Sequence, residues 1–243
     1  MKWRIGALLL LAALPGVVAS SWLAVPLLVD ASRIPVSLEA LQVATAVQNA
    51  VLVLAAALAG TALAPRVGLA APVAAAIAGK GRVLEALRPQ LAPGLVGGCV
   101  GAGVIVGFHA FAPEPIRAIQ PGTPLPLAVR VLYGGITEEV LVRWGLMTAM
   151  AWAGWRLLSR DLQQPSSGVM WGAIAASAVA FGAAHLPAVG QSLPTLSAHV
   201  AAYVTIGNAL FGVVAGYLLW RYGLEASMVA HVSAHVLAYA FRG

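Results

Sequence analysis

The chain has 243 residues, of which 60% are hydrophobic and only 9% are charged. Soluble domains usually carry about 25% charged residues, so a soluble fold of this composition could not cover its own surface. The net charge is +6, but no Lys/Arg cluster interleaved with aromatic residues is present, which excludes a nucleic-acid partner. Cys99 is the single cysteine, which excludes an intrachain disulfide and a cysteine-based metal cluster.

Apolar stretches long enough to cross a bilayer recur along the whole chain. Segments that span a membrane must be helical, because each backbone polar group needs a partner within its own segment. The sequence therefore predicts an all-α fold, a polytopic transmembrane helix bundle of about seven spans in the lipid bilayer. A further apolar piece, Leu69–Ala78, is too short to cross. The predicted spans are, in chain order, Ile5–Val29, Leu38–Ala64, Leu91–Ala112, Leu127–Leu158, Val169–Leu186, Leu196–Trp220 and Leu224–Phe241.

The first span also has the layout of a signal peptide. Lys2 and Arg4 precede its apolar run, and Val18-Ala19-Ser20 resembles a cleavage site. Apolar character resumes from Trp22 to Val29, so the segment is long enough to cross. We therefore expect an uncleaved first helix.

The basic residues between the spans predict the orientation. With the N-terminus in the cytoplasm, the outer segments hold only Arg33, Arg117 and Arg242. The inner segments hold Lys2, Arg4, Arg66, Lys80, Arg82, Arg88, Arg156, Arg160 and Arg221. This asymmetry follows the positive-inside rule and predicts a multi-pass protein of the cell inner or plasma membrane, with its C-terminus outside. We divide it into N-terminal transmembrane helices (1–126) and a core (127–243) that carries the polar motifs, within one integrated membrane domain.

Three charged residues stand close together inside the fourth predicted span. A charged side chain costs about 2.5–3.5 kcal/mol at the bilayer centre, so each of these residues is expected to have a structural or functional role there. Glu139 and Arg143 are four residues apart, share one face of an α-helix and can form an ion pair. Glu138 is rotated by about 100° from Glu139 and has no local partner. Its carboxyl group is a candidate general base or acid; the alternative is a structural ion pair with one spare acid.

Histidines stand in the later spans. His231 and His235 are four residues apart and share a helix face, a spacing that zinc ligands use, although the Glu of the H-E-x-x-H motif is absent. His185 lies near the end of the fifth predicted span and, taken alone, is as readily a satisfied polar residue as a catalytic one. His109 and His199 have no acidic neighbour, and we predict that they form hydrogen bonds between helices.

Three motifs stand in one order on successive hydrophobic helices: Glu-Glu-x-x-x-Arg, Phe-x-x-x-His and a late His-x-x-x-polar. In this order they resemble the family of CAAX prenyl endopeptidases and bacteriocin-processing enzymes, also called the abortive-infection family. The resemblance covers roughly Leu127 to the C-terminus. The matching residues are Glu138, Glu139, Arg143, Phe181, His185, His231 and His235.

The resemblance implies an intramembrane endopeptidase without a cofactor. Glu138 and His185 would activate a water molecule, and His231 with His235 would stabilise the oxyanion. The remaining motif residues would support them, the first motif through its Glu–Arg ion pair and the second through Phe181, which precedes the histidine by one turn. The substrate would be a peptide or a membrane-anchored protein.

Two alternatives remain open at this stage. The family commonly has Asn where this chain has His235, and an imidazole can either donate one hydrogen bond in place of the amide or bind a metal. A zinc-dependent protease would use His185, His231 and His235 as ligands, with Glu138 as the base. A non-catalytic membrane transporter or partner subunit is the second alternative, because intramembrane Glu and His also form proton relays.

The depth of the histidines tests these alternatives. The predicted span ends place His185 near the outer side and His231 nearer the inner side, so a helix must tilt or break for them to meet. Pro187 permits such a break. Convergence of both histidines and Glu138 on one site would favour the protease over a relay.

Overall fold

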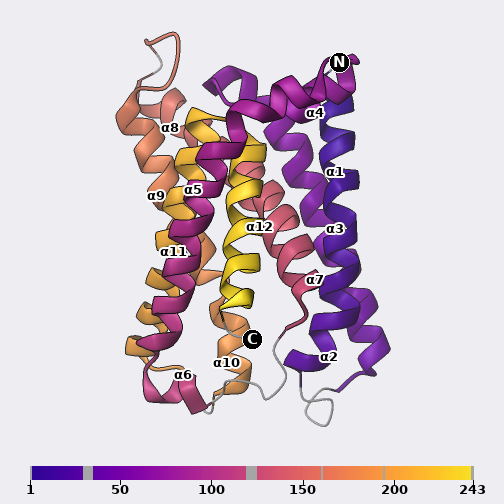
Figure 1. Ribbon diagram of the computed structural model, residues 1–243, viewed down its shortest axis with the longest axis vertical. Coiled ribbons are helices and arrows are strands. Elements are labelled where there is room, and N and C mark those ends of the chain that lie inside the picture. The colour runs from indigo at the N-terminus through magenta and orange to yellow at the C-terminus, as the bar shows by residue number, and fades with distance from the viewer. Residues whose placement is uncertain (1, 30–34, 119–124, 160, 194, 242–243) are drawn as a thin grey trace.

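The computed structural model describes residues 2–29, 35–118, 125–159, 161–193 and 195–241. Within these residues the chain forms helices joined by turns and no strand. The long helices run alongside one another, and the short helix α4 (Pro72–Gly79) lies across the end of the bundle that holds the N-terminus (Figure 1). This arrangement confirms the predicted all-α, polytopic class.

The elements follow the predicted spans closely. In chain order they are α1 (Lys2–Ala19), η1 (Ser20–Ala24), α2 (Val25–Leu28), α3 (Leu38–Leu63), η3 (Ala64–Val67), α4 (Pro72–Gly79), α5 (Val83–Ala110), α6 (Glu114–Ala118), α7 (Leu127–Val129), η4 (Arg130–Thr137), η5 (Glu139–Met147), α8 (Thr148–Leu158), α9 (Ser167–Ala183), α10 (Leu186–Ser192), α11 (Ala198–Arg221) and α12 (Leu224–Ala240).

Five helical segments of the described chain are long and apolar enough to cross a membrane. They are Lys2–Leu28, Leu38–Val67, Val83–Ala110, Ser167–Ser192 and Ala198–Arg221. The other two predicted spans are also helical, but the fourth carries the charged motif and α12 has only 17 residues. The chain is therefore a multi-pass membrane protein, and a total of seven crossings stays a prediction.

Serine caps explain where three helices begin. The side chains of Ser37, Ser166 and Ser197 accept hydrogen bonds from backbone N–H groups three residues later, at 3.1, 3.3 and 3.3 Å. Such caps satisfy donors that a helix leaves without a partner at its start. The start of α5 differs from the prediction, because this helix begins at Val83, well before the predicted Leu91. Glu85 in the first turn of α5 favours this earlier start, because a negative charge is stabilising at the beginning of a helix.

The fifth predicted span breaks near its end. α9 ends at Ala183 and α10 begins at Leu186, so His185 lies at the junction between them. Pro187 lacks a backbone N–H and cannot continue the hydrogen bonds of the preceding helix. The break that this proline permits is therefore present.

The fourth predicted span is one continuous helix, but most of it is π-helical. η4 and η5 are π-helical segments that flank Glu138. Hydrogen bonds in a π-helix join residues five apart, and such segments occur frequently at functional sites. The hydroxyl of Thr137 lies 3.2 Å from the carbonyl oxygen of Leu132 and 2.7 Å from that of Ala13 in α1. The backbone on either side of Glu138 therefore has π-helical hydrogen bonding, where the sequence had suggested an α-helix.

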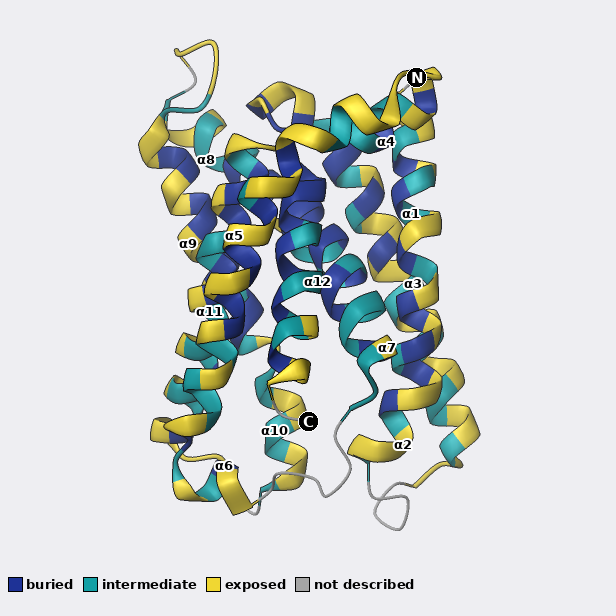
Figure 2. Cartoon of the chain, in the orientation of Figure 1, coloured by how far each residue is buried: buried dark blue, intermediate teal, exposed yellow. Residues whose placement is uncertain are grey.

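Both predicted parts of the chain contribute to one buried core, seen as dark blue segments in Figure 2. Ala13 and Ala57 from the first part pack in the same cluster as Met147 and Ala151 from the second. The indole of Trp144 also lies 3.4 Å from the hydroxyl of Thr61. This shared core fixes the fourth helix against α1 and α3.

α5 packs closely against α12 through its glycines. A Cβ atom at Gly98 would lie 2.4 Å from Cβ of Ser233, and one at Gly101 would lie 2.8 Å from Cβ of Ala234. Small residues at four-residue spacing allow helices in lipid to approach in this way. The contact positions α12, and with it the late histidines, against the rest of the bundle.

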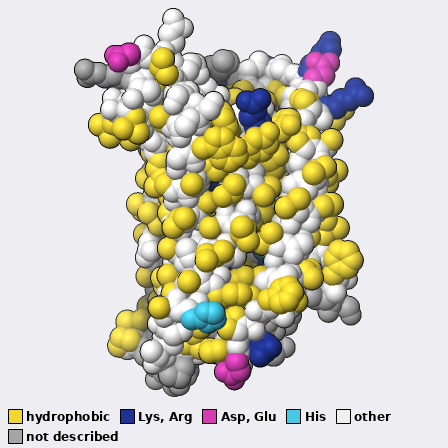
Figure 3. Space-filling view, turned by 90° about the vertical axis from the view of Figure 1, so that its left-hand side faces the viewer, with side chains coloured by type: hydrophobic (Ala, Val, Ile, Leu, Met, Phe, Trp, Pro, Cys, Tyr) yellow, Lys and Arg dark blue, Asp and Glu magenta, His cyan; other side chains and the backbone are white. Residues whose placement is uncertain are grey.

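The outer surface is hydrophobic between two charged ends. Figure 3 shows a broad band of apolar side chains, with Lys, Arg, Asp and Glu gathered above and below it. This is the surface that a bilayer requires. Arg33, Arg160 and Arg242 lie outside the described residues, and the orientation of the termini stays a prediction.

Candidate active site

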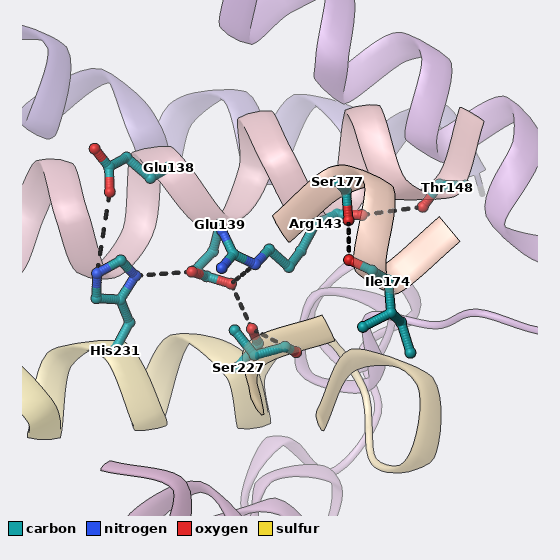
Figure 4. Close-up of polar contacts among 9 residues, drawn as sticks. Glu138, Glu139, Arg143, Thr148, Ile174, Ser177, Ser227 and His231 are labelled. Carbon is teal, nitrogen blue, oxygen red and sulfur yellow. Dashed lines mark hydrogen bonds and ion pairs between the residues drawn. The ribbon is translucent and has the colours of Figure 1, made fainter. Parts of the chain in front are cut away.

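Glu139 is the centre of a polar cluster inside the bundle. Its side chain is fully buried, and Figure 4 shows donors approaching it from two helices. Its Oε1 accepts a hydrogen bond from Nδ1 of His231 at 2.8 Å, and its Oε2 lies 3.5 Å from Nε of Arg143. The hydroxyl of Ser227 donates to the same Oε2. These partners confirm the predicted Glu–Arg pair and explain how a carboxylate tolerates complete burial.

His231 lies between two carboxyl groups (Figure 4). Because a carboxylate only accepts hydrogen bonds, Nδ1 of His231 carries the proton shared with Glu139. Its Nε2 faces the other way and lies 4.0 Å from Oε2 of Glu138, whose side chain is 18% exposed. Glu138 thus forms the more accessible side of the cluster. The sequence offered no local partner for Glu138; the structure brings His231 of α12 to it, so that both carboxyl groups flank the same imidazole.

Phe181 of α9 connects the charged and imidazole groups. Its ring centroid lies 4.4 Å from Cζ of Arg143, within cation–π range. The rings of His185 and His231 stand nearly perpendicular to it, with centroids 4.8 and 6.2 Å away. These are ordinary edge-to-face distances, and they confirm the predicted packing of Phe181 beside His185. One aromatic ring therefore contacts groups from the fourth helix, α9 and α12.

His185 is held at the break between α9 and α10. Its Nδ1 lies 2.8 Å from the carbonyl oxygen of Phe181 and must donate, because a carbonyl only accepts. In the neutral form its Nε2 then carries a lone pair, as a general base requires. The offset in depth implied by the predicted span ends is absent, because His185 and His231 contact the same ring. Within the described residues no hydrogen bond joins Glu138 directly to His185.

His235 follows His231 by one turn of α12. The two rings are stacked, with centroids 5.0 Å apart. Nδ1 of His235 is buried and has no hydrogen-bond partner in the described chain. His235 also interacts electrostatically with His185 and Arg130. The four predicted catalytic residues therefore gather in one region.

Gly134 of η4 leaves room for the two late histidines. A Cβ atom at this position would lie 2.9 Å from Nε2 of His235 and 3.5 Å from Nε2 of His231. The first distance is shorter than a normal van der Waals contact, so any side chain here would displace the His235 ring. Gly134 therefore keeps open the space that both Nε2 atoms face.

We expect Gly134→Ala to lower cleavage of a peptide substrate while the fold is retained. Alanine favours helix by about 0.5–1 kcal/mol over glycine, which offsets part of the crowding. The matched control is Gly103→Ala in α5, where a Cβ would meet nothing within 4 Å. Cleavage rates and thermal unfolding of both variants in detergent test this expectation; equal activity of the two variants would contradict it.

Sequence reasoning missed two side chains of the cluster. Ser227 lies four residues before His231 on the same face of α12, and this spacing was the available signal. Phe211 of α11 places its ring 4.6 Å from that of His231, and its sequence carries no such signal. The prediction for His199 is wrong, because this residue is exposed at the start of α11 and makes no hydrogen bond within the described chain.

No group of three or more His, Cys, Asp or Glu side chains in the described residues is arranged to hold a metal ion. Nδ1 of His231 is already bonded to Glu139, and Nδ1 of His185 to a carbonyl. The predicted zinc ligands therefore do not form a ready coordination site within the described residues.

The fold and this cluster define the class: a multi-pass, all-α membrane protein with an acid–imidazole site between its helices. Residues 120–237 match the family described as Type II CAAX prenyl endopeptidase Rce1-like. This match covers slightly less than half of the chain and confirms the resemblance that the motifs indicated. Every motif residue from Glu138 to His235 lies within the match. No curated protein and no solved structure matches the chain.

Proposed function

We propose that this protein is an intramembrane endopeptidase in which Glu138 and His185 activate water for hydrolysis of a peptide bond. The observation that carries the proposal is the gathering of Glu138 with His185, His231 and His235 around one buried charge network. Glu138 is the partly exposed acid of this group, which suits the residue that must contact the attacking water. Its carboxylate takes a proton from water and passes it to the leaving amine.

The two Nδ1 contacts support this division of roles. The contact between His185 and the carbonyl oxygen of Phe181 leaves Nε2 of His185 facing away from the backbone. The contact between His231 and Glu139 leaves Nε2 of His231 facing away from the buried carboxylate. The gap of 4.0 Å between Nε2 of His231 and Glu138 is too long for a hydrogen bond and suits a bridging water molecule. A nucleophilic water in this position would lie next to the general base.

His231 and His235 supply the oxyanion stabilisation in this proposal. His231 can donate from Nε2 only when both ring nitrogens are protonated, since its Nδ1 proton is already used. Hydrogen-bond donors in such a dry site contribute several kcal/mol to lowering the barrier.

Chelation separates the metal-free proposal from the zinc alternative. We expect the purified protein to keep its cleavage activity after chelator treatment, and elemental analysis to find far less than one zinc per chain in the active sample. Loss of activity on chelation, with recovery on adding zinc, would instead establish the metal-dependent alternative.

The second alternative is a non-catalytic transporter or partner subunit. A proton relay of that kind predicts ionisable groups dispersed in a line through the bundle and not gathered at one site. The cluster around Phe181 favours the protease instead. The substrate we propose is a peptide precursor or a membrane-anchored protein. Comparing the cleaved termini of the membrane proteome in cells with the intact chain and with Glu138→Gln tests this. Identical sets of termini would argue against proteolysis.

A further inference from the structure

A second polar site lies away from the acid–imidazole cluster, at the end of the bundle that holds the N-terminus and α4 (Figure 1). It is an open cavity of about 530 Å³ between η3, which follows α3, and the end of α8. Its charged lining residues are Arg66 and Arg156, and its aromatic ones are Trp152 and Trp155. None of the predicted protease residues lines it.

Both arginines of this cavity lack an acidic partner. The ion pairs of the described chain involve other residues, and the guanidinium of Arg156 lies only over the ring of Trp155, at 5.9 Å from Cζ to the centroid. Arg66 and Arg156 are both exposed at the cavity. Two guanidinium groups without an acidic partner beside one cavity suit phosphate, because each can bind phosphate oxygens through two parallel hydrogen bonds.

The cavity wall is held in place by the turn after α8. Nε1 of Trp155 donates a hydrogen bond of 3.1 Å to the carbonyl oxygen of Leu162. Gln164 packs against Gly68, where a Cβ would lie 2.6 Å from Oε1 of the glutamine. Gly68 has a φ of +72°, a conformation that glycine adopts readily. The glutamine amides thus add hydrogen-bonding groups to the lining.

The surroundings point to a lipid as the source of the phosphate. Leu157, Leu158 and Leu162 beside the cavity are 81%, 79% and 50% exposed. Exposed leucines next to arginines and tryptophans are typical of the level where acyl chains meet headgroups, and tryptophan is enriched at that level. Basic pockets between transmembrane helices on the cytoplasmic side bind anionic headgroups.

We propose that this cavity binds the phosphate-bearing headgroup of an anionic phospholipid, with Arg66 and Arg156 on the phosphate and the leucines against the acyl chains. Native mass spectrometry of the protein from mixed micelles tests it. Phosphatidylglycerol should be retained, whereas phosphatidylcholine at the same concentration should not. Arg66→Gln/Arg156→Gln should weaken retention by at least about tenfold.

The control is Lys80→Gln/Arg88→Gln, which removes two positive charges outside the cavity and should retain the lipid. Equal retention by the cavity variant and the control would overturn the proposal. A second variant, Arg66→Lys/Arg156→Lys, keeps both positive charges and should retain an intermediate amount of phosphatidylglycerol. The proposal would also be contradicted if this variant retained as little lipid as the Gln pair and unfolded at a much lower temperature than the parent protein. Thermal unfolding of the parent protein distinguishes a lipid from free phosphate. If inorganic phosphate protects the protein from unfolding as strongly as phosphatidylglycerol does, the lipid assignment is overturned.

Discussion

Glu138→Gln is expected to lower the rate of peptide cleavage by about 10²–10⁴-fold, the usual contribution of a general acid–base group. The amide has the same shape as the acid but cannot accept and return a proton. Because the side chain is 18% exposed and lies 4.0 Å from its nearest ionic partner, its replacement should leave the fold intact. Single-turnover cleavage in detergent and thermal unfolding of the same sample measure the two effects separately.

The matched control for Glu138→Gln is Glu39→Gln, an exposed acid in the first turn of α3. It makes the same chemical change at a distance from the cluster, and cleavage should continue at the parent rate. If Glu138→Gln also cleaves at nearly the parent rate, Glu138 is not the general base, and this conclusion does not depend on the roles of the histidines.

Glu139→Gln is expected to destabilise the protein by about 3–5 kcal/mol, because it leaves the buried guanidinium of Arg143 without its counter-charge. Arg143 is 1% exposed, and its two terminal nitrogens have no hydrogen-bond partner in the described chain. The same change also weakens the acceptor for Nδ1 of His231. Unfolding in a denaturing-detergent titration, followed by tryptophan fluorescence, measures the loss.

An exposed pair provides the comparison. Arg82 and Glu85 form an ion pair of 2.6 Å with side chains that are 81% and 66% exposed, so Glu85→Gln should cost at most about 1 kcal/mol. In the buried pair, Glu139→Gln/Arg143→Met should be less destabilised than the two single changes added together, because no unpaired charge is left. Equal effects of Glu139→Gln and Glu85→Gln would show that the buried network does not stabilise the fold. If Glu139→Gln yields no folded protein, the double variant still tests this expectation.

The candidate site was partly visible in the sequence because its chemistry is unusual for a membrane helix. Glu138, Glu139 and Arg143 stood out by the cost of placing charges in lipid. The four-residue spacing predicted the Glu139–Arg143 pair, which the structure confirms. The partner of Glu138 could not be predicted in this way, because His231 lies on α12. The π-helical backbone of the fourth helix also leaves no periodic pattern in the sequence.

The sequence by itself determined the class of fold, the approximate ends of most helices and the break before Pro187. These features follow from local properties: hydrophobic length, serine caps and the missing N–H of proline. Only the tertiary structure decided that His231 lies between two carboxyl groups, and that one phenylalanine ring contacts His185, His231 and Arg143. Such contacts join helices far apart in the chain, and the close approach of α12 to the glycines of α5 helps to position α12 among them. Helix packing of this kind depends on the shapes of both surfaces at once, which no single stretch of sequence contains.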